Sequence, residues 1–163
     1  MQYLANKKIV LTSSITTVIM AFIVMVLFDP MVDGKNGFDV IALQLSFSKE
    51  IGVDIVSNWN IEAFKKWIVL DYLYALSYMI FFASIIFWLE KERSVPYSKY
   101  PYIAIFAGVF DWIENSIEVW FLNNMDGFSS TIFFIHSILA TLKWLALPII
   151  VWRIIKLYQL KRV

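Results

Sequence analysis

The chain has no cysteine, one histidine, five glycines and four prolines among its 163 residues. Without cysteine it has no disulfide, no thiolate metal site and no cysteine nucleophile. One histidine excludes a haem or zinc site built from several histidines of this chain. Glycine is too scarce for a phosphate-binding loop, and no Walker A, nucleophile-elbow, Rossmann or His-Glu-x-x-His motif is present. These absences exclude an enzyme of the soluble type.

The composition is instead strongly apolar. Hydrophobic residues make up 60% of the chain and aromatic residues 18%, and the mean hydropathy is +0.69. Soluble domains are usually about 45–50% apolar. The net charge of +1 gives no basic surface for nucleic acid, so we expect no nucleic-acid partner. The composition indicates an integral membrane protein surrounded by membrane lipids.

Four apolar runs are long enough to cross a bilayer, which takes about 20 residues in a helix. They cover residues 9–28, 67–89, 100–122 and 131–152. Asp29-Pro30 ends the first run, and the charged residues 90–93 end the second. The sequence therefore predicts an all-α fold, a four-transmembrane-helix bundle that forms one membrane domain over residues 1–163.

Lysine and arginine set the expected orientation. With both termini inside, nine basic residues lie on the cytoplasmic side and four outside, and Lys143 falls within a span. The nine are Lys7, Lys8, Lys91, Arg93, Lys99, Arg153, Lys156, Lys161 and Arg162, and the four are Lys35, Lys49, Lys65 and Lys66. The positive-inside rule then predicts an N-in/C-in protein of the bacterial cytoplasmic membrane.

One sizeable segment, residues 30–66, lies between spans and would be extracytoplasmic. It opens with turn residues at positions 33–37. Apolar residues then recur at helical spacing, at Phe38, Ile41 and Leu45. We expect this loop to carry a short amphipathic helix, and Asn58 or Asn60 to cap the following helix. Two interpretations are open: a lid over the outer end of the bundle, or a docking surface for a partner.

Polar residues recur at helical spacing in the last three spans, so that each set shares one face. They are Asp71, Tyr74 and Tyr78 in the second span, Asp111, Glu114, Asn115 and Glu118 in the third, and His136 and Lys143 in the fourth. Charged residues at such depth are costly unless paired or hydrated, which makes them candidates for function. We predict that these nine residues form a ligand-binding site.

The expected depths divide this site into two tiers. The deep tier holds Tyr78, Asp111, Glu114 and Lys143, and the shallow tier holds Asp71, Glu118 and His136. The two tiers would line an acidic cleft that opens outward and ends near the middle of the membrane. Lys143 is the natural partner of Asp111 or Glu114. Four acids share one certain base, so at least two must be protonated, hydrated or bound to something cationic.

The same residues carry a resemblance. The chain resembles a group of uncharacterised bacterial four-span integral membrane proteins through Leu70-Asp71-Tyr72-Leu73-Tyr74 with Tyr78, Phe110-Asp111-Trp112-Ile113-Glu114-Asn115, and Leu142-Lys143-Trp144. The shared elements cover about half of the chain, residues 67–144, and the Asp-x-x-Glu-Asn element is the most specific. The resemblance implies that the polar positions form one pattern, but it implies no activity. A looser topological similarity links the chain to bundles of the emopamil-binding/sigma-2 type, which keep carboxylates in a cavity for cationic or sterol-like ligands, although their motif spacing differs.

Several functions fit these residues. The leading hypothesis is binding of a small or lipid-like molecule, with a cation among the candidates. A non-catalytic accessory subunit of a larger membrane complex and a proton- or ion-coupled carrier acting as a homo-oligomer are alternatives, as is catalysis on a membrane substrate with Lys143 as acid or base. A purely structural polar network that fixes helix rotation is the remaining interpretation.

We predict no cofactor and assign no metal site from the sequence. Oxygen ligands and one nitrogen ligand suited to Mg²⁺, Mn²⁺ or iron are present. They are Asp71, Asp111, Glu114, Glu118 and His136. The chain nevertheless lacks the paired Glu-x-x-His motifs of di-iron bundles.

Overall fold

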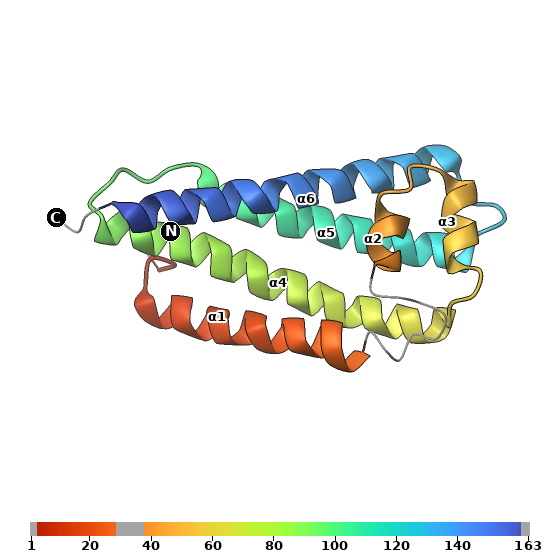
Figure 1. The fold of residues 1–163 in the computed structure, drawn as a ribbon, viewed down its shortest axis with the longest axis horizontal. Helices are drawn as coiled ribbons and strands as arrows, with labels where there is room; N and C mark the ends of the chain where they lie inside the picture. The colour runs from red at the N-terminus through yellow and green to blue at the C-terminus, as the bar shows by residue number, and fades with distance from the viewer. Residues whose placement is uncertain (1–2, 29–37, 161–163) are drawn as a thin grey trace.

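The structure is a computed structural model that describes residues 3–28 and 38–160, and within these ranges it is entirely helical (Figure 1). Four long helices dominate. The first, α1, covers Lys7–Phe22 and continues as a π-helical segment, η1, over Ile23–Phe28. The others are α4 (Ile61–Glu92), α5 (Tyr100–Asn123) and α6 (Ser130–Gln159). The all-α prediction is confirmed.

Each long helix begins where the sequence supplies a suitable residue. The side chain of Asn60 accepts a hydrogen bond from the backbone N–H of Ala63 at 3.1 Å, so α4 begins six residues before the predicted span. Asn6 caps α1 and Ser129 caps α6 in the same way. Pro101 lies in the first turn of α5, where the missing N–H costs no hydrogen bond.

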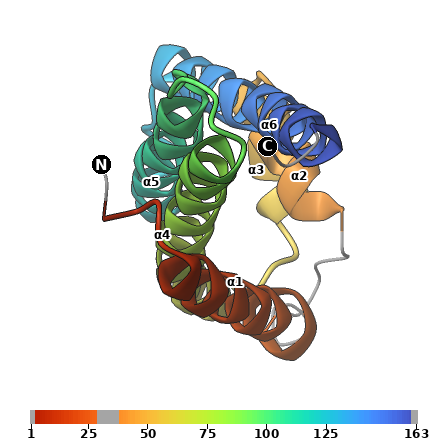
Figure 2. The same ribbon diagram turned by 90° about the vertical axis from the view of Figure 1, so that its left-hand side faces the viewer.

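The four long helices run alternately in opposite directions, and the start of α1 and the end of α6 lie at the same end of the bundle (Figure 1). Helix α5 packs against both α4 and α6, and α1 packs along α4. Figure 2 shows α1 displaced from α6, with α4 and α5 along one side of the bundle.

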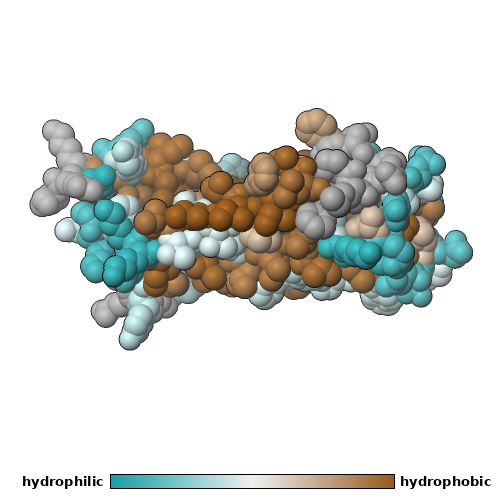
Figure 3. Space-filling view, turned by 90° about the horizontal axis from the view of Figure 1, so that it is seen from below, coloured by the Kyte–Doolittle hydropathy of each residue, from teal (hydrophilic) through white to brown (hydrophobic). Residues whose placement is uncertain are grey.

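Three of the helical stretches are long and apolar enough to span a membrane: Lys7–Leu27, Ile61–Glu92 and Ser130–Gln159. A hydrophobic band covers the middle of the face seen in Figure 3, and hydrophilic residues gather at its two ends. Helix α5 has 24 residues, enough for a span, but its three acids make it less apolar than the other three. These features indicate a membrane protein.

Apolar side chains form two clusters along the bundle, one toward each end. The cluster near the α5–α6 connection includes Phe64, Phe121 and Phe133. The other includes Ile86 and Ile150. Tyr78 belongs to the second cluster, and Tyr74 packs against both. The charged and amide residues of the predicted site lie between the residues of the two clusters along α4, α5 and α6, so the polar site occupies the middle of the bundle.

The connection between η1 and α4 contains two short helices rather than the one expected: α2 (Asp39–Gln44) and α3 (Lys49–Val56). We refer to residues 38–57 as the lid. The predicted turn at 33–37 and the start of the loop at residue 30 lie outside the described residues.

The lid packs against α6 and the α5–α6 connection. The backbone N–H of Phe47 donates to Ser137 Oγ at 3.2 Å, and Lys49 Nζ donates to the carbonyl of Asp126 at 2.9 Å. The face of α2 directed at the bundle carries Val40, Leu43 and Gln44. Of the apolar face expected from the sequence, Phe38 and Leu45 are exposed and Ile41 is half-buried. Contact with α6 therefore determines the rotation of α2.

Candidate functional site

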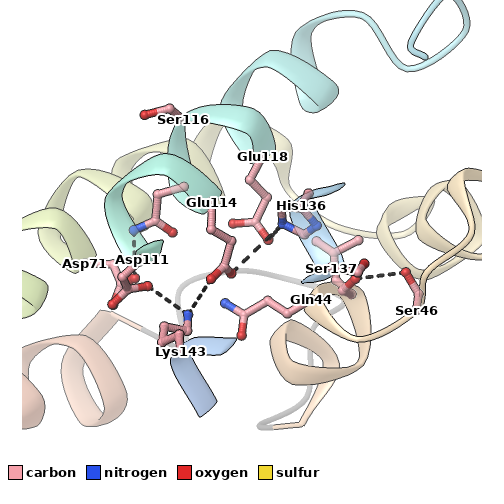
Figure 4. Close-up of polar contacts among 12 residues, drawn as sticks. Gln44, Ser46, Asp71, Asp111, Glu114, Ser116, Glu118, His136, Ser137 and Lys143 are labelled. Carbon is pink, nitrogen blue, oxygen red and sulfur yellow. Dashed lines mark hydrogen bonds and ion pairs between the residues drawn. The ribbon is translucent and has the colours of Figure 1, made fainter. Parts of the chain in front are cut away.

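All nine predicted residues lie on α4, α5 and α6 in the middle of the bundle. Every one except Tyr74, which is half-buried, is buried. Figure 4 shows the acids of α5 directed at Lys143 and His136 of α6. Their i, i+3 and i+7 spacing along α5 places these acids on the face that meets α4 and α6.

Lys143 is the centre of one group, the lysine cluster, formed with Tyr78, Asp111 and Glu114. Its Nζ lies 2.8 Å from Asp111 Oδ1 and 2.6 Å from Glu114 Oε2. Tyr78 donates its hydroxyl to the other oxygen of Asp111 at 2.8 Å. The expected pairing of Lys143 with Asp111 or Glu114 occurs with both acids, and these four residues are the predicted deep tier.

A second group, the histidine cluster, consists of Glu114, Glu118 and His136. Nε2 of His136 lies 3.6 Å from Glu118 Oε1 and 4.0 Å from Glu114 Oε1. The side chains of all three are at most 1% exposed. Among the described residues, neither nitrogen of His136 and neither carboxylate oxygen of Glu118 has a hydrogen-bond partner. Glu114 belongs to both clusters and links them.

Asp71 and Tyr74 line the α4 side of the site. Asn115 donates its side-chain N–H to Asp71 Oδ2 at 3.0 Å, and the ring of Tyr74 meets the ring of Tyr78 edge-on at 5.4 Å between centroids. Asp71 lies beside Asp111 (Figure 4) rather than with Glu118 and His136, where the two-tier scheme placed it. The hydrogen bond from Asn115 shows which part of α5 lies opposite Asp71, and this register between two helices is not encoded by the pattern of one helix.

Sequence reasoning missed Gln44, which the lid contributes beside the site. Gln44 is buried and accepts a hydrogen bond from the indole N–H of Trp144 at 3.0 Å. In Figure 4 its side chain extends between Lys143 and Ser137. A glutamine inside the apolar stretch 40–45 is the sequence feature that could have indicated this residue. The sequence does not show that this stretch packs beside the spans.

A separate buried ion pair, also missed, lies nearer the other end of α4 and α6. Glu90 Oε1 lies 2.8 Å from Arg153 Nη2. The Glu90 carboxylate also accepts hydrogen bonds from the backbone N–H of Ser98, at 3.1 Å, and from its hydroxyl. These bonds join α4, α6 and the α4–α5 connection, and they leave Arg153 Nε as the buried atom of the pair without a partner among the described residues.

The structure has surface hollows elsewhere. One, of about 360 Å³, lies between α1 and α4 and is lined by Lys8, Thr12, Ser77 and others. A second lies at the α5–α6 connection and a third near Lys91. None of these three is lined by the nine predicted residues. The acids therefore form a compact buried group rather than the walls of one of these hollows.

No known family, curated protein or solved structure matches this chain. The site is therefore interpreted from its own residues. Four acids surround one lysine and one histidine in the interior of an apolar bundle, and several of their polar atoms lack a hydrogen-bond partner within residues 3–28 and 38–160. Such an arrangement attracts positive charge strongly, because carboxylates in a medium of low polarity are stabilised only by a nearby cation, a proton or hydrogen-bond donors.

Proposed function

We propose that the chain is a four-span membrane protein that binds a small cationic species at the buried acids of α5. Both termini would lie on the cytoplasmic side of a bacterial membrane. Helix α5, the third span in chain order, would cross the membrane together with the three more apolar helices. We also propose membership of the bacterial four-span group that the sequence resembles, on the strength of the Asp-x-x-Glu-Asn element in α5.

One observation carries the proposal. The carboxylate of Glu118 is buried in the bundle and has no hydrogen-bond partner in the part of the chain that the structure describes, and it lies on the same face of α5 as Asp111 and Glu114. Lys143 contacts both of those acids but not Glu118. A carboxylate within a span costs up to about 3 kcal/mol on insertion scales unless a proton, a cation or hydrogen-bond donors compensate it. A bound cation removes this cost.

The size of the site limits the ligand. Because the side chains of both clusters are buried, the site accommodates an ion or the charged group of a larger molecule. A lipid-like ligand would therefore insert a cationic group between α5 and α6 and leave its apolar part against the helices or the surrounding lipid. The range of small or lipid-like ligands expected from the sequence is thereby narrowed to ions and to molecules that carry an insertable cationic group.

Thermal unfolding of the purified protein in mild detergent tests the proposal with two probes, Mn²⁺ and octylammonium, whose small cationic group is carried on an apolar chain. A ligand that binds the folded state alone raises Tm in proportion to the logarithm of its concentration once it exceeds Kd. We expect a saturable rise with at least one probe. Glu118→Gln and Glu114→Gln should abolish the rise, and the surface variant Glu92→Gln should retain it.

Failure of both probes to raise the Tm of the wild type would contradict cation binding, whatever the variants do. Recovery of the chain in a stoichiometric complex with other subunits, together with that failure, would favour an accessory subunit. Size measurement in the same detergent reports whether the chain forms a homo-oligomer, as a carrier of four spans would require.

A further inference from the structure

The histidine cluster has the geometry of an incomplete metal coordination shell. Its carboxylates come from consecutive turns of α5, at positions i and i+4, and its imidazole comes from α6. One ligand atom from each of Glu114, Glu118 and His136 lies within 4.8 Å of the others. Three protein ligands from two rigid helices leave further coordination positions for water or a substrate atom.

His136 provides evidence for a bound ligand that does not depend on the acidic residues. Its ring is buried, is directed at Glu114 and Glu118 (Figure 4), and has no hydrogen-bond partner on either nitrogen among the described residues. A buried polar group without a partner costs about 1–3 kcal/mol. A metal ion bound to Nε2 would satisfy the nitrogen and the facing carboxylate oxygens together.

The separations between donor atoms agree with a shared ion. Zinc lies about 2.0–2.2 Å from imidazole nitrogen and carboxylate oxygen, so two ligands of one ion lie about 3.0–3.6 Å apart. His136 Nε2 and Glu118 Oε1 are 3.6 Å apart, and His136 Nε2 and Glu114 Oε1 are 4.0 Å apart. Because the three donor atoms lie within 4.8 Å of one another, side-chain movements of up to about 1 Å bring all three around one ion.

Lys143 orients Glu114 for this role. It holds Glu114 Oε2 at 2.6 Å, which leaves Oε1 directed toward His136. Residues that bond to a metal ligand without contacting the metal typically fix the orientation of that ligand. Charge also balances, because a divalent ion neutralises Glu114 and Glu118, and Lys143 neutralises Asp111. Asp71 is then the one acid whose charge is not balanced by a cation, and a proton together with the hydrogen bond from Asn115 compensates it.

We propose that Glu114, Glu118 and His136 bind a divalent first-row transition-metal ion of the Mn²⁺, Fe²⁺ or Zn²⁺ type. The inference rests on the proposed function, of which it names the ligand class. Two carboxylates favour a hard ion, and the imidazole favours a transition metal over Mg²⁺ or Ca²⁺. The chain has no cysteine to favour a softer ion. Sequence spacing did not favour a metal site, because the histidine lies on a different helix from the acids.

His136 is the one histidine of the sequence, which makes the test decisive. The protein is purified with its affinity tag removed, incubated with Mn²⁺ and desalted. Metal content is measured, and electron spin-echo modulation reports nitrogen bound to the ion. We expect stoichiometric Mn²⁺ with ¹⁴N modulation that disappears when the protein is made with ¹⁵N-histidine. Prior incubation with Zn²⁺ should block Mn²⁺ uptake.

Two variants complete the design. His136→Gln should lose the nitrogen modulation and most of the bound Mn²⁺, and Glu92→Gln should keep both. If His136→Gln fails to fold, the isotope experiment on the wild type still decides. Mn²⁺ that is not retained, or is retained without ¹⁴N modulation, would overturn the metal site. If octylammonium then still raises Tm through Glu118, the proposed function survives while this inference fails.

Discussion

Gly52 of α3 lies directly against the ring of Phe133 on α6. A β-carbon added at Gly52 would lie 2.3 Å from Phe133 Cζ, closer than real β-carbons approach other atoms. The Phe133 ring in turn packs 5.4 Å from His136, measured between ring centroids. This contact therefore connects the position of the lid to His136, the histidine of the proposed metal site.

The first prediction is that Gly52→Ala destabilises the protein. Alanine is favoured over glycine within a helix by about 1 kcal/mol, so helix propensity alone predicts a gain. Overpacking costs about 1–3 kcal/mol, and the Phe133 ring is held by Phe121 at 4.9 Å between centroids. We therefore expect a net loss in the free energy of unfolding, measured in mixed detergent micelles.

Gly127→Ala is the matched control, because nothing lies within 4 Å of a β-carbon added there. It should leave stability nearly unchanged. In a Phe133→Leu background, Gly52→Ala should cost less than in the wild type. Equal costs in the two backgrounds would show that the ring does not limit the approach of α3.

The second prediction concerns Lys143. Replacing it by methionine keeps the apolar stem but leaves Asp111 and Glu114 without the cation that contacts both. Removing one partner of a buried ion pair costs about 3–5 kcal/mol. Combining Lys143→Met with Asp111→Asn should restore part of this loss, because one stranded charge is removed. A double-mutant cycle on the free energy of unfolding measures the coupling.

Lys91→Met serves as the control, since Lys91 is exposed at the end of α4. It should change stability by less than about 0.5 kcal/mol. Strict additivity of Lys143→Met and Asp111→Asn would contradict the pairing.

The third prediction compares two acids of α4, Glu90 and Glu92, which lie two residues apart. Glu90 is fully buried and pairs with Arg153, whereas Glu92 is exposed. Glu90→Ala should lower the free energy of unfolding by about 3 kcal/mol, because it leaves Arg153 without its partner. Glu92→Ala should have little effect. Similar losses for the two variants would show that the Glu90 pair adds nothing to stability.

The sequence predicts the long helices well because each apolar run has to satisfy its backbone internally in lipid, which leaves helix as the available structure. It also predicts which residues share the site, because 3.6-residue periodicity assigns polar side chains to faces. It does not predict the pairing. Whether Lys143 contacts Asp111, Glu114 or both depends on the tilt and rotation of α6 against α5.

Glu90 and the lid illustrate the same limit. In the charged run 90–93, four polar residues in a row indicate the end of a span, and only the position of α6 makes Glu90 buried. In α2, both faces carry apolar residues, so composition does not decide between them. Contact with α6 buries Leu43 and Gln44 and leaves Phe38 exposed.

The last prediction tests whether α5 crosses the membrane. The chain has no cysteine, so one introduced thiol is the only site for a maleimide. Lys99→Cys, just before α5, and Gly127→Cys, just after it, replace exposed residues. If α5 spans and the termini are cytoplasmic, an impermeant maleimide labels Gly127→Cys in intact spheroplasts and labels Lys99→Cys only after lysis. The reverse pattern would invert the orientation, and labelling of both sites from one side would show that α5 does not span.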